Sequence, residues 1–446
     1  MVRTRTPWFI VAILFLAWAY GIYDGRFGDS SDYVPADIQE RILAYQDRNL
    51  RLEEIALHQP EIIKKTLFSS DRDEVLSDAA EALEAFEEEG ALEETGLRAL
   101  AVIREESGTP QEDLSELDPV TRSILLEEPV SRDDASDLAG RIGSREGAWW
   151  DERLGIRLTG YQANREVTHA LTGWNEESER RFLIALAGSA GWWLLAVGGL
   201  LFLPHAIRVT RSGWTIASLH RPVRYGSRWE PSSVVALLLA ADLLAGFVLS
   251  SAYEATASIE TGFIFDVVVD SLWRVIAPTI ALLILFRKPR HAIRSLGLGV
   301  RPDWRLILAA FAVISWVDFG FNTLVQPWIE PDPTGGLDPM ENGWGGLFYG
   351  LLSACVLAPI AEETFYRGIL LRGLERRFGF WLSASVVTLA FTLAHSYDFF
   401  GLIGVGMLGS TMVVIYRTTG ALTTIILFHA LYNFMITLPN WLVYHW

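Results

Sequence analysis

Long apolar runs separated by short polar segments dominate the chain from Phe182 onward, and one further apolar run lies between Pro7 and Tyr23. About 20 consecutive apolar residues are needed to cross the hydrocarbon core of a bilayer as a helix. The pattern therefore predicts an all-α, polytopic membrane protein with an eight-helix core and an additional N-terminal helix. The eight expected core segments are Phe182–Leu203, Val234–Ser251, Val267–Phe286, Leu306–Val325, Gly345–Leu371, Trp381–Ser396, Gly401–Tyr416 and Ala421–Leu438.

The first apolar run follows Arg3 and Arg5 and has the form of a secretory signal. Ala17-Trp18-Ala19 resembles a cleavage site, which would make the run a removable signal peptide. The bulky Trp18 and the length of the run favour a retained anchor over residues 1–23 instead. In both cases the segment that follows is expected to be exported.

The region 24–180 differs sharply in charge from the rest of the chain. It holds 38 acidic and 17 basic residues, a net of −21, whereas the remainder holds 16 and 20, a net of +4, which together give the overall −17. Apolar positions such as Val75, Ala79, Leu83 and Phe86 recur at helical spacing. Residues 24–180 are therefore predicted to form an acidic, mostly helical extramembrane module. Its aromatic stretch 149–174 suits a membrane interface and a buried core equally well.

Positive charge alternates from loop to loop along the membrane region. Arginines fill the loops around Arg221, Arg290 and Arg376, while the opposite loop 326–344 is acidic and rich in Pro and Gly. Cytoplasmic loops carry the excess of Lys and Arg. The chain is thus expected to be a multi-pass protein of the cell (inner) membrane, with its N-terminus inside and residues 24–180 extracytoplasmic.

Several site types can be set aside on sequence grounds. No basic, aromatic-interleaved surface is evident, so nucleic acid is not an expected partner. Cys355 is the only cysteine, which leaves no internal disulfide and no cysteine-based metal site. The His-Glu-x-x-His helix of zinc proteases is absent. The run 404–409 matches a dinucleotide fingerprint by letter, but without its strand–turn–helix context it is better explained by close helix packing.

Two adjacent carboxylates, Glu362 and Glu363, lie near the end of an apolar segment. Ionisable residues in a spanning segment are costly and usually face a protein-lined cavity with a function. Glu363 and Arg367 are four residues apart and can pair on one helix face, which leaves Glu362 pointing elsewhere as a free base. Pro359 lacks an N–H and is expected to loosen the helix just before the pair. The alternative is a structural ion pair where the helix leaves the membrane.

His395 and His429, with Asn433 one turn further on, are the remaining polar candidates in spanning segments. A single membrane histidine is more often a helix–helix hydrogen-bonding residue, but two in the segments after a Glu-Glu pair favour chemistry. Asn433 beside His429 suits an oxyanion site, or else interhelical hydrogen bonding. Asp270 and Arg274, also four apart, are expected to neutralise each other.

This set resembles the CAAX prenyl-endopeptidase and bacteriocin-processing (CPBP, or Abi) family of intramembrane metalloproteases. The resemblance covers roughly 345–438 and rests on Glu-Glu-x-x-x-Arg, Phe-x-x-x-His and His-x-x-x-Asn in this order. It implies an intramembrane endopeptidase acting on a membrane-associated protein or peptide, with a catalytic domain at 345–446 and accessory helices at 181–344. The acidic module lies outside the resemblance and is a candidate binding module for an extracytoplasmic partner.

The resemblance also implies roles for the residues. Glu362 and His395 would activate a water molecule, His429 and Asn433 would stabilise the oxyanion, and Glu363 and Arg367 would support the site. Glu362, His395 and His429 can alternatively ligate zinc, which leaves one position for water, or hold a water alone. The pairing of Asn433 with His429 favours the metal-free reading.

Counting residues places His395 deeper in the membrane than Glu362, so their convergence requires helix tilt or a motif helix that continues well past Arg367. Two other functions remain open from the sequence. One is a non-catalytic immunity or scaffold protein on the same fold. The other is a transporter that uses the membrane charges as an ion path, although no repeat between the two halves is evident.

Overall fold

The structure is a computed structural model, and every element named in it is a helix. It describes residues 5–27, 35–57, 72–88, 92–111, 113–143, 148–216, 229–256, 263–286, 288–325, 328–329, 343–395, 397 and 399–444. Seven helices in these ranges are long and apolar enough to cross a membrane, and two shorter apolar helices accompany them. The prediction of an all-α polytopic membrane protein is confirmed.

Each of these nine apolar helices in the described ranges overlaps a segment that the sequence predicts, although several have different ends. The two shorter ones are the apolar parts of α1 (Trp8–Phe27) and α18 (Phe380–Leu393). The others are single helices or continuous helical runs. They are α9 (Arg165–Gly199) with α10 (Leu203–Ile216), α11 (Pro231–Thr256), α12 (Phe263–Leu285), α14 (Trp304–Val325), α15 (Gly343–Leu352) through α17 (Arg372–Phe378), α19 (Phe399–Thr419) and α20 (Leu422–Tyr444).

The acidic region has a hydrophobic core of its own, built from short helices. Trp149, Trp150 and Trp174 are buried in that core, so the aromatic stretch serves packing rather than a membrane interface. The helices are α2 (Pro35–Leu57), α4 (Arg72–Glu88), α5 (Glu94–Glu106), α6 (Pro119–Leu125), α7 (Arg132–Gly143) and α8 (Trp149–Tyr161).

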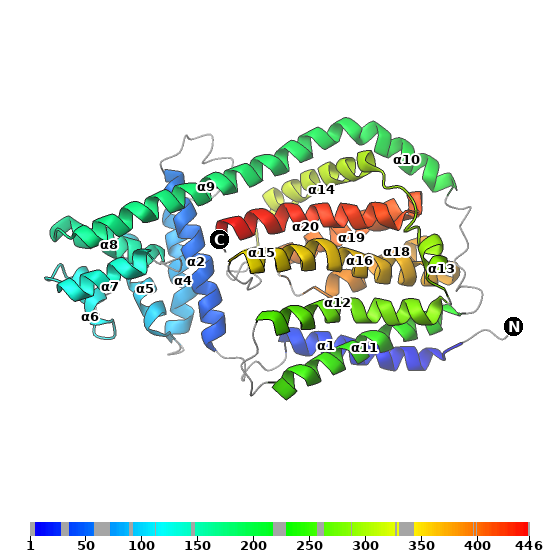
Figure 1. The fold of residues 1–446 in the computed structure, drawn as a ribbon, viewed down its shortest axis with the longest axis horizontal. Coiled ribbons are helices and arrows are strands. Elements are labelled where there is room, and N and C mark those ends of the chain that lie inside the picture. The colour runs from blue at the N-terminus through cyan, green and yellow to red at the C-terminus, as the bar shows by residue number, and fades with distance from the viewer. Residues whose placement is uncertain are drawn as a thin grey trace.

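Helix α9 (Arg165–Gly199) joins this module to the membrane region without an intervening loop (Figure 1). Asn164 caps its N-terminus by accepting from the N–H groups of Glu166 and Val167. The helical run continues through η2 (Leu200–Phe202) and α10 (Leu203–Ile216), so the spanning segment is much longer than the expected Phe182–Leu203. A boundary near residue 180 therefore falls inside a helix.

The helix that carries the two glutamates runs through the middle of the membrane region, beside α20 (Figure 1). It extends from Gly343 to Phe378 and consists of α15 (Gly343–Leu352), η5 (Ser353–Leu357), α16 (Ala358–Glu362), η6 (Glu363–Leu371) and α17 (Arg372–Phe378). Segments η5 and η6 are π-helical, a rare geometry that often occurs at functional sites. Helix α1 lies against α11 at the edge of the bundle.

Candidate active site

Glu363, Arg367 and His429 form a buried polar network. The Arg367 Nη1 atom lies 3.1 Å from Glu363 Oε1, and both side chains are completely buried. His429 Nδ1 lies 2.9 Å from the same carboxylate oxygen. Because a carboxylate only accepts, the Nδ1–H of His429 is the donor, which leaves its Nε2 for other partners. The predicted Glu363–Arg367 pair is confirmed, and it also orients His429.

A glycine on α19 makes room for the arginine. Arg367 Nη2 donates to the Gly409 carbonyl across 3.2 Å. A Cβ atom at Gly409 would lie 3.0 Å from that nitrogen and 3.1 Å from the ring of Phe391, so a side chain here would crowd both. The glycine-rich run 404–409 thus serves close helix packing at this position, as the sequence indicates.

Glu362 points away from this network. Its Oε1 lies 3.9 Å from Arg274 Nη1, beyond hydrogen-bonding distance but close enough for attraction. Its Oε2 is buried and has no hydrogen-bond partner within the part of the chain that the structure describes. Arg274 was expected to pair with Asp270, whose side chain lies outside the described residues. A cation beside Glu362 is therefore a feature that helix spacing alone does not reveal.

His395 lies just beyond the end of its helix and not within a spanning segment extending to Ser396 as predicted. Helix α18 ends at Leu393. Beyond that end, the His395 N–H donates to the Thr392 carbonyl. The His395 Nδ1 atom lies 2.7 Å from the Phe391 carbonyl. A carbonyl only accepts, so Nδ1 carries the proton and Nε2 of the neutral ring carries a lone pair.

The ring of Phe391 connects the candidate residues. Its centroid lies 4.8 Å from that of His395 and 6.2 Å from that of His429. The Arg367 guanidinium carbon lies 4.1 Å from the same centroid, within the range of a cation–π interaction. Phe391 is fully buried. The phenylalanine of the Phe-x-x-x-His pattern thus separates the two histidines and packs on the arginine.

Asn433 is held by the backbone of the glutamate-bearing helix. Its Nδ2 donates to the Ala354 carbonyl across 2.7 Å. In η5 the Ala358 N–H bonds Ser353 instead of Ala354, and Pro359 has no N–H with which to reach Ala354. Asn433 therefore satisfies the carbonyl that the π-helical turn and the proline leave without a helical donor. The sequence predicts that Pro359 loosens the helix, whereas the hydrogen bond from the Asn433 side chain to the Ala354 carbonyl is seen only in the fold.

The length of the glutamate-bearing helix resolves the difference in depth. This helix continues to Phe378, well past Arg367 and past the predicted end at Leu371. Glu362 is 16 residues before Phe378, and His395 is 15 residues after Phe380. Glu362 and His395 are separated by similar numbers of residues from the tight turn that joins α17 to α18. The two residues can thus reach the same level.

The three residues considered as zinc ligands do not form a ligand set in this arrangement. Within the described ranges, no three His, Cys, Asp or Glu side chains come together so that they could hold a metal ion. His429 uses Nδ1 on Glu363, and His395 uses Nδ1 on a backbone carbonyl. These bonds occupy only the Nδ1 atoms and leave both Nε2 atoms available, so zinc ligation by Glu362, His395 and His429 stays a prediction, and no step below depends on a metal.

Comparison with known families confirms the resemblance seen in the sequence. Residues 344–435 match the family model described as "Type II CAAX prenyl endopeptidase Rce1-like". The match covers about a fifth of the chain and contains all six candidate residues, from Glu362 to Asn433. Neither the curated proteins nor the solved structures yield a match. This segment is therefore similar to CAAX-type proteases, and it lies in a multi-pass membrane protein.

Proposed function

We propose that this protein is an intramembrane endopeptidase that hydrolyses a peptide bond of a membrane-associated protein or peptide with a water molecule as nucleophile. The family likeness of residues 344–435 supports the class of reaction. The observation that carries the proposal is the buried Oε2 of Glu362, which has no hydrogen-bond partner among the described residues, beside the Glu363–Arg367–His429 network. Glu363 Oε2 and Arg367 Nε also lack a partner there, but Glu363 is bonded to Arg367 and His429 through its other oxygen, whereas no hydrogen bond from the described residues holds Glu362. A buried polar atom without a partner calls for an explanation, and a bound substrate water supplies one.

Glu362 is the base in this proposal. Arg274 lies 3.9 Å from one oxygen of its carboxylate, and the other oxygen can accept a proton from water. His395 can accept a hydrogen bond from the same water through Nε2, because its Nδ1–H is engaged. The water oxygen attacks the scissile carbonyl carbon while its proton passes to Glu362.

His429 stabilises the oxyanion in this proposal. In the proposed mechanism His429 carries a proton on Nε2 as well as on Nδ1, and Glu363 lies 2.9 Å from Nδ1. That Nε2–H can donate to the oxyanion of the tetrahedral intermediate, and the second N–H of the Asn433 amide is a further donor nearby. When the C–N bond breaks, the proton held by Glu362 passes to the leaving amine.

The test is a matched pair of substitutions in the glutamate-bearing helix. Glu362→Gln removes the basic oxygen and keeps the size, whereas Glu375→Gln alters a carboxylate that pairs with Arg417 outside the site. Proteomic analysis of new protein termini in membranes should show cleavage products with the native chain and with Glu375→Gln. They should be absent with Glu362→Gln at equal abundance. Persistence of the products in Glu362→Gln would refute the mechanism, and a non-catalytic scaffold role would then be the better account.

We also propose that the acidic module, residues 24–180, faces the extracytoplasmic side of the cell membrane, as the alternation of arginine-rich loops indicates. Protease added to intact spheroplasts should digest this module and spare the loop around Arg221. Digestion of the Arg221 loop with protection of the module would invert the orientation.

A further inference from the structure

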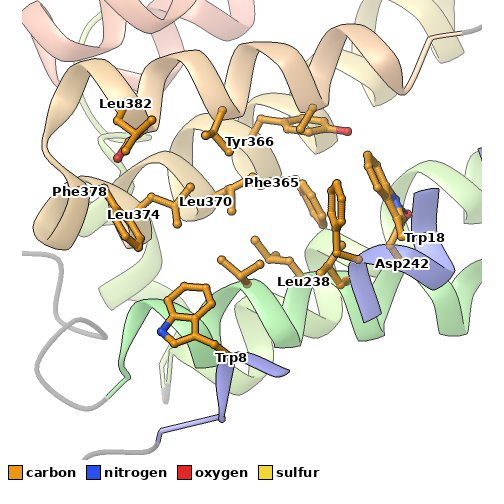
Figure 2. Close-up of a pocket in the computed structure, with 16 residues that line it drawn as sticks. Trp8, Trp18, Leu238, Asp242, Phe365, Tyr366, Leu370, Leu374, Phe378 and Leu382 are labelled. Carbon is orange, nitrogen blue, oxygen red and sulfur yellow. Dashed lines mark hydrogen bonds between the residues drawn. The ribbon is translucent and has the colours of Figure 1, made fainter. Parts of the chain in front are cut away.

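An apolar pocket of about 290 Å³ lies between α1, α11, the segment η6–α17 and α18 (Figure 2). Its walls include Leu238, Phe365 and Leu374, and every helix around it belongs to an apolar, membrane-crossing run or to one of the shorter apolar helices. Residues at its rim are open to the surroundings, with Phe15 52% and Leu382 56% exposed. In a membrane these surroundings are lipid.

Helix α1 closes one side of the pocket and is fixed there by two polar contacts. Trp18 Nε1 donates to Asp242 Oδ2 across 2.9 Å, and Thr6 donates to the Ser233 hydroxyl through its N–H and its own hydroxyl, at 2.7 and 3.0 Å. The ring of Trp8 meets that of Phe378 edge-on at 6.0 Å. The N-terminal helix is therefore part of the wall of this pocket.

The lining of the pocket decides what it can hold. An extended peptide would bring N–H and C=O groups that need partners. The lining offers few, because Asp242 already accepts from Trp18 and the Ser383 hydroxyl donates to the Gly379 carbonyl. Water does not fill apolar cavities. A hydrocarbon chain fits.

Exposed arginines lie close in sequence to Trp8 and Phe378, which form one end of the pocket. Arg377 is exposed, and its guanidinium carbon lies 5.9 Å from the Phe378 ring centroid. Arg376 and Arg5 are also exposed and lie within three residues of the two aromatic side chains. In Figure 2, Trp8 and Phe378 lie at the opposite end from Trp18 and Asp242. Clusters of arginine at a membrane surface attract anionic lipid headgroups.

We propose that this pocket binds one anionic phospholipid, with an acyl chain between α1 and α18 and the phosphate beside Arg377. The hydrocarbon chain contacts the apolar lining and supplies dispersion contacts that an empty pocket would lack. The arginines favour a negatively charged headgroup. Tyr366, one turn after Glu362, also lines the pocket, so the bound chain forms the lipid-side wall next to the candidate active site.

The probe is a phosphatidylglycerol that carries a photoreactive diazirine halfway along one acyl chain, in vesicles of phosphatidylethanolamine and phosphatidylglycerol that contain the full-length protein. Crosslinks should map to peptides containing Leu238, Phe365 or Leu374. Leu238→Trp fills the pocket and should reduce these crosslinks at least tenfold. Leu389→Trp makes the same change at a 59% exposed site on α18 outside the pocket and should leave them unchanged.

Two further variants complete the test. One replaces Leu238→Trp if that variant misfolds, and the other distinguishes binding of the headgroup from binding of the acyl chain. Leu382→Trp, at the rim, is the alternative filling variant if Leu238→Trp unfolds. Arg377→Gln should reduce labelling by the phosphatidylglycerol probe several-fold relative to a phosphatidylethanolamine probe with the same chain. Equal labelling in the filled and control variants would overturn the proposal. So would preferential labelling of the pocket by an isoprenoid diazirine, which would point to a chain attached to the substrate.

Discussion

The side-chain amide of Asn433 donates to the Ala354 carbonyl across 2.7 Å. In the glutamate-bearing helix this carbonyl lies one π-helical turn before Pro359, which has no N–H to donate to it. This contact joins α20 to the helix that carries Glu362. Asn433 and His429 lie one turn apart on α20. Each bonds a different position of the glutamate-bearing helix, since His429 bonds Glu363 and Asn433 bonds Ala354.

The Asn433–Ala354 contact predicts that the effects of Asn433→Ala and Pro359→Ala on stability are coupled. Asn433→Ala should destabilise the protein by about 1–3 kcal/mol, because it leaves the Ala354 carbonyl without a partner. In a Pro359→Ala background an N–H at position 359 can serve this carbonyl, or the helix can return to α geometry. The cost of Asn433→Ala should then be smaller. Unfolding measurements in detergent on the two single variants and the double variant give the coupling, and strict additivity would contradict the assignment.

Glu363 is predicted to matter first for stability. Glu363→Ala leaves Arg367 buried without its anion, and breaking one partner of a buried pair costs about 3–5 kcal/mol. Replacing both members, with Glu363→Gln and Arg367→Met together, should recover much of this loss. Thermal unfolding of the purified protein is the measurement. A Glu363→Ala variant that unfolds like the native chain but lacks activity would show that the division of labour with Glu362 is wrong.

Gly409→Ala is predicted to be destabilising, unlike the same change at a nearby glycine of the same helix. In Gly409→Ala the new Cβ crowds Arg367 and Phe391, and such overpacking typically costs about 1–3 kcal/mol. Gly404→Ala is the control, because its nearest neighbour outside the helix is Asp318 at an ordinary 3.9 Å. The two variants should differ in unfolding temperature and in yield. Equal behaviour would mean that α18 and α19 can separate at this point without cost.

The acidic module is predicted to lose stability as the pH rises from about 4.5 to 7. Burial raises the pKa of Glu152 to about 7, above its usual 4.5, and Arg153 offsets this only in part. The folded module then binds more protons than the unfolded one between about pH 4.5 and 7, so stability falls across that window and is lowest above it. At about 1.4 kcal/mol per pKa unit the difference is about 3 kcal/mol. Burial raises the pKa of Asp151 as well, which acts in the same direction.

Glu152→Gln should remove most of this pH dependence and stabilise the module at pH 8. Hydrogen exchange of peptides from α8 in the full-length protein, corrected for intrinsic rates between pH 5 and 8, measures the effect. Glu94→Gln is the control, since the Glu94 side chain is 68% exposed. The same pH profile in Glu152→Gln as in the native chain would assign the effect to another group.

The positions of the membrane helices could be predicted from sequence because spanning length and apolar composition are local properties. The pair of Glu363 with Arg367 followed from helical spacing for the same reason, since residues four apart share a face. The ends of the elements were less accessible. The segment expected to end at Leu371 continues to Phe378, and the one expected to include His395 ends at Leu393, because apolar composition does not record where backbone hydrogen bonds stop.

The sequence by itself thus determined the membrane class, the acidic module and the identity of the candidate residues, all of which depend on composition and short-range spacing. Only the tertiary structure decided their partners. It placed His429 on Glu363, Arg274 beside Glu362, and Asn433 on the Ala354 carbonyl. It also placed Phe391 between the two histidines. These contacts join segments up to 88 residues apart, and they depend on how the helices are rotated and packed against each other, which no local pattern specifies.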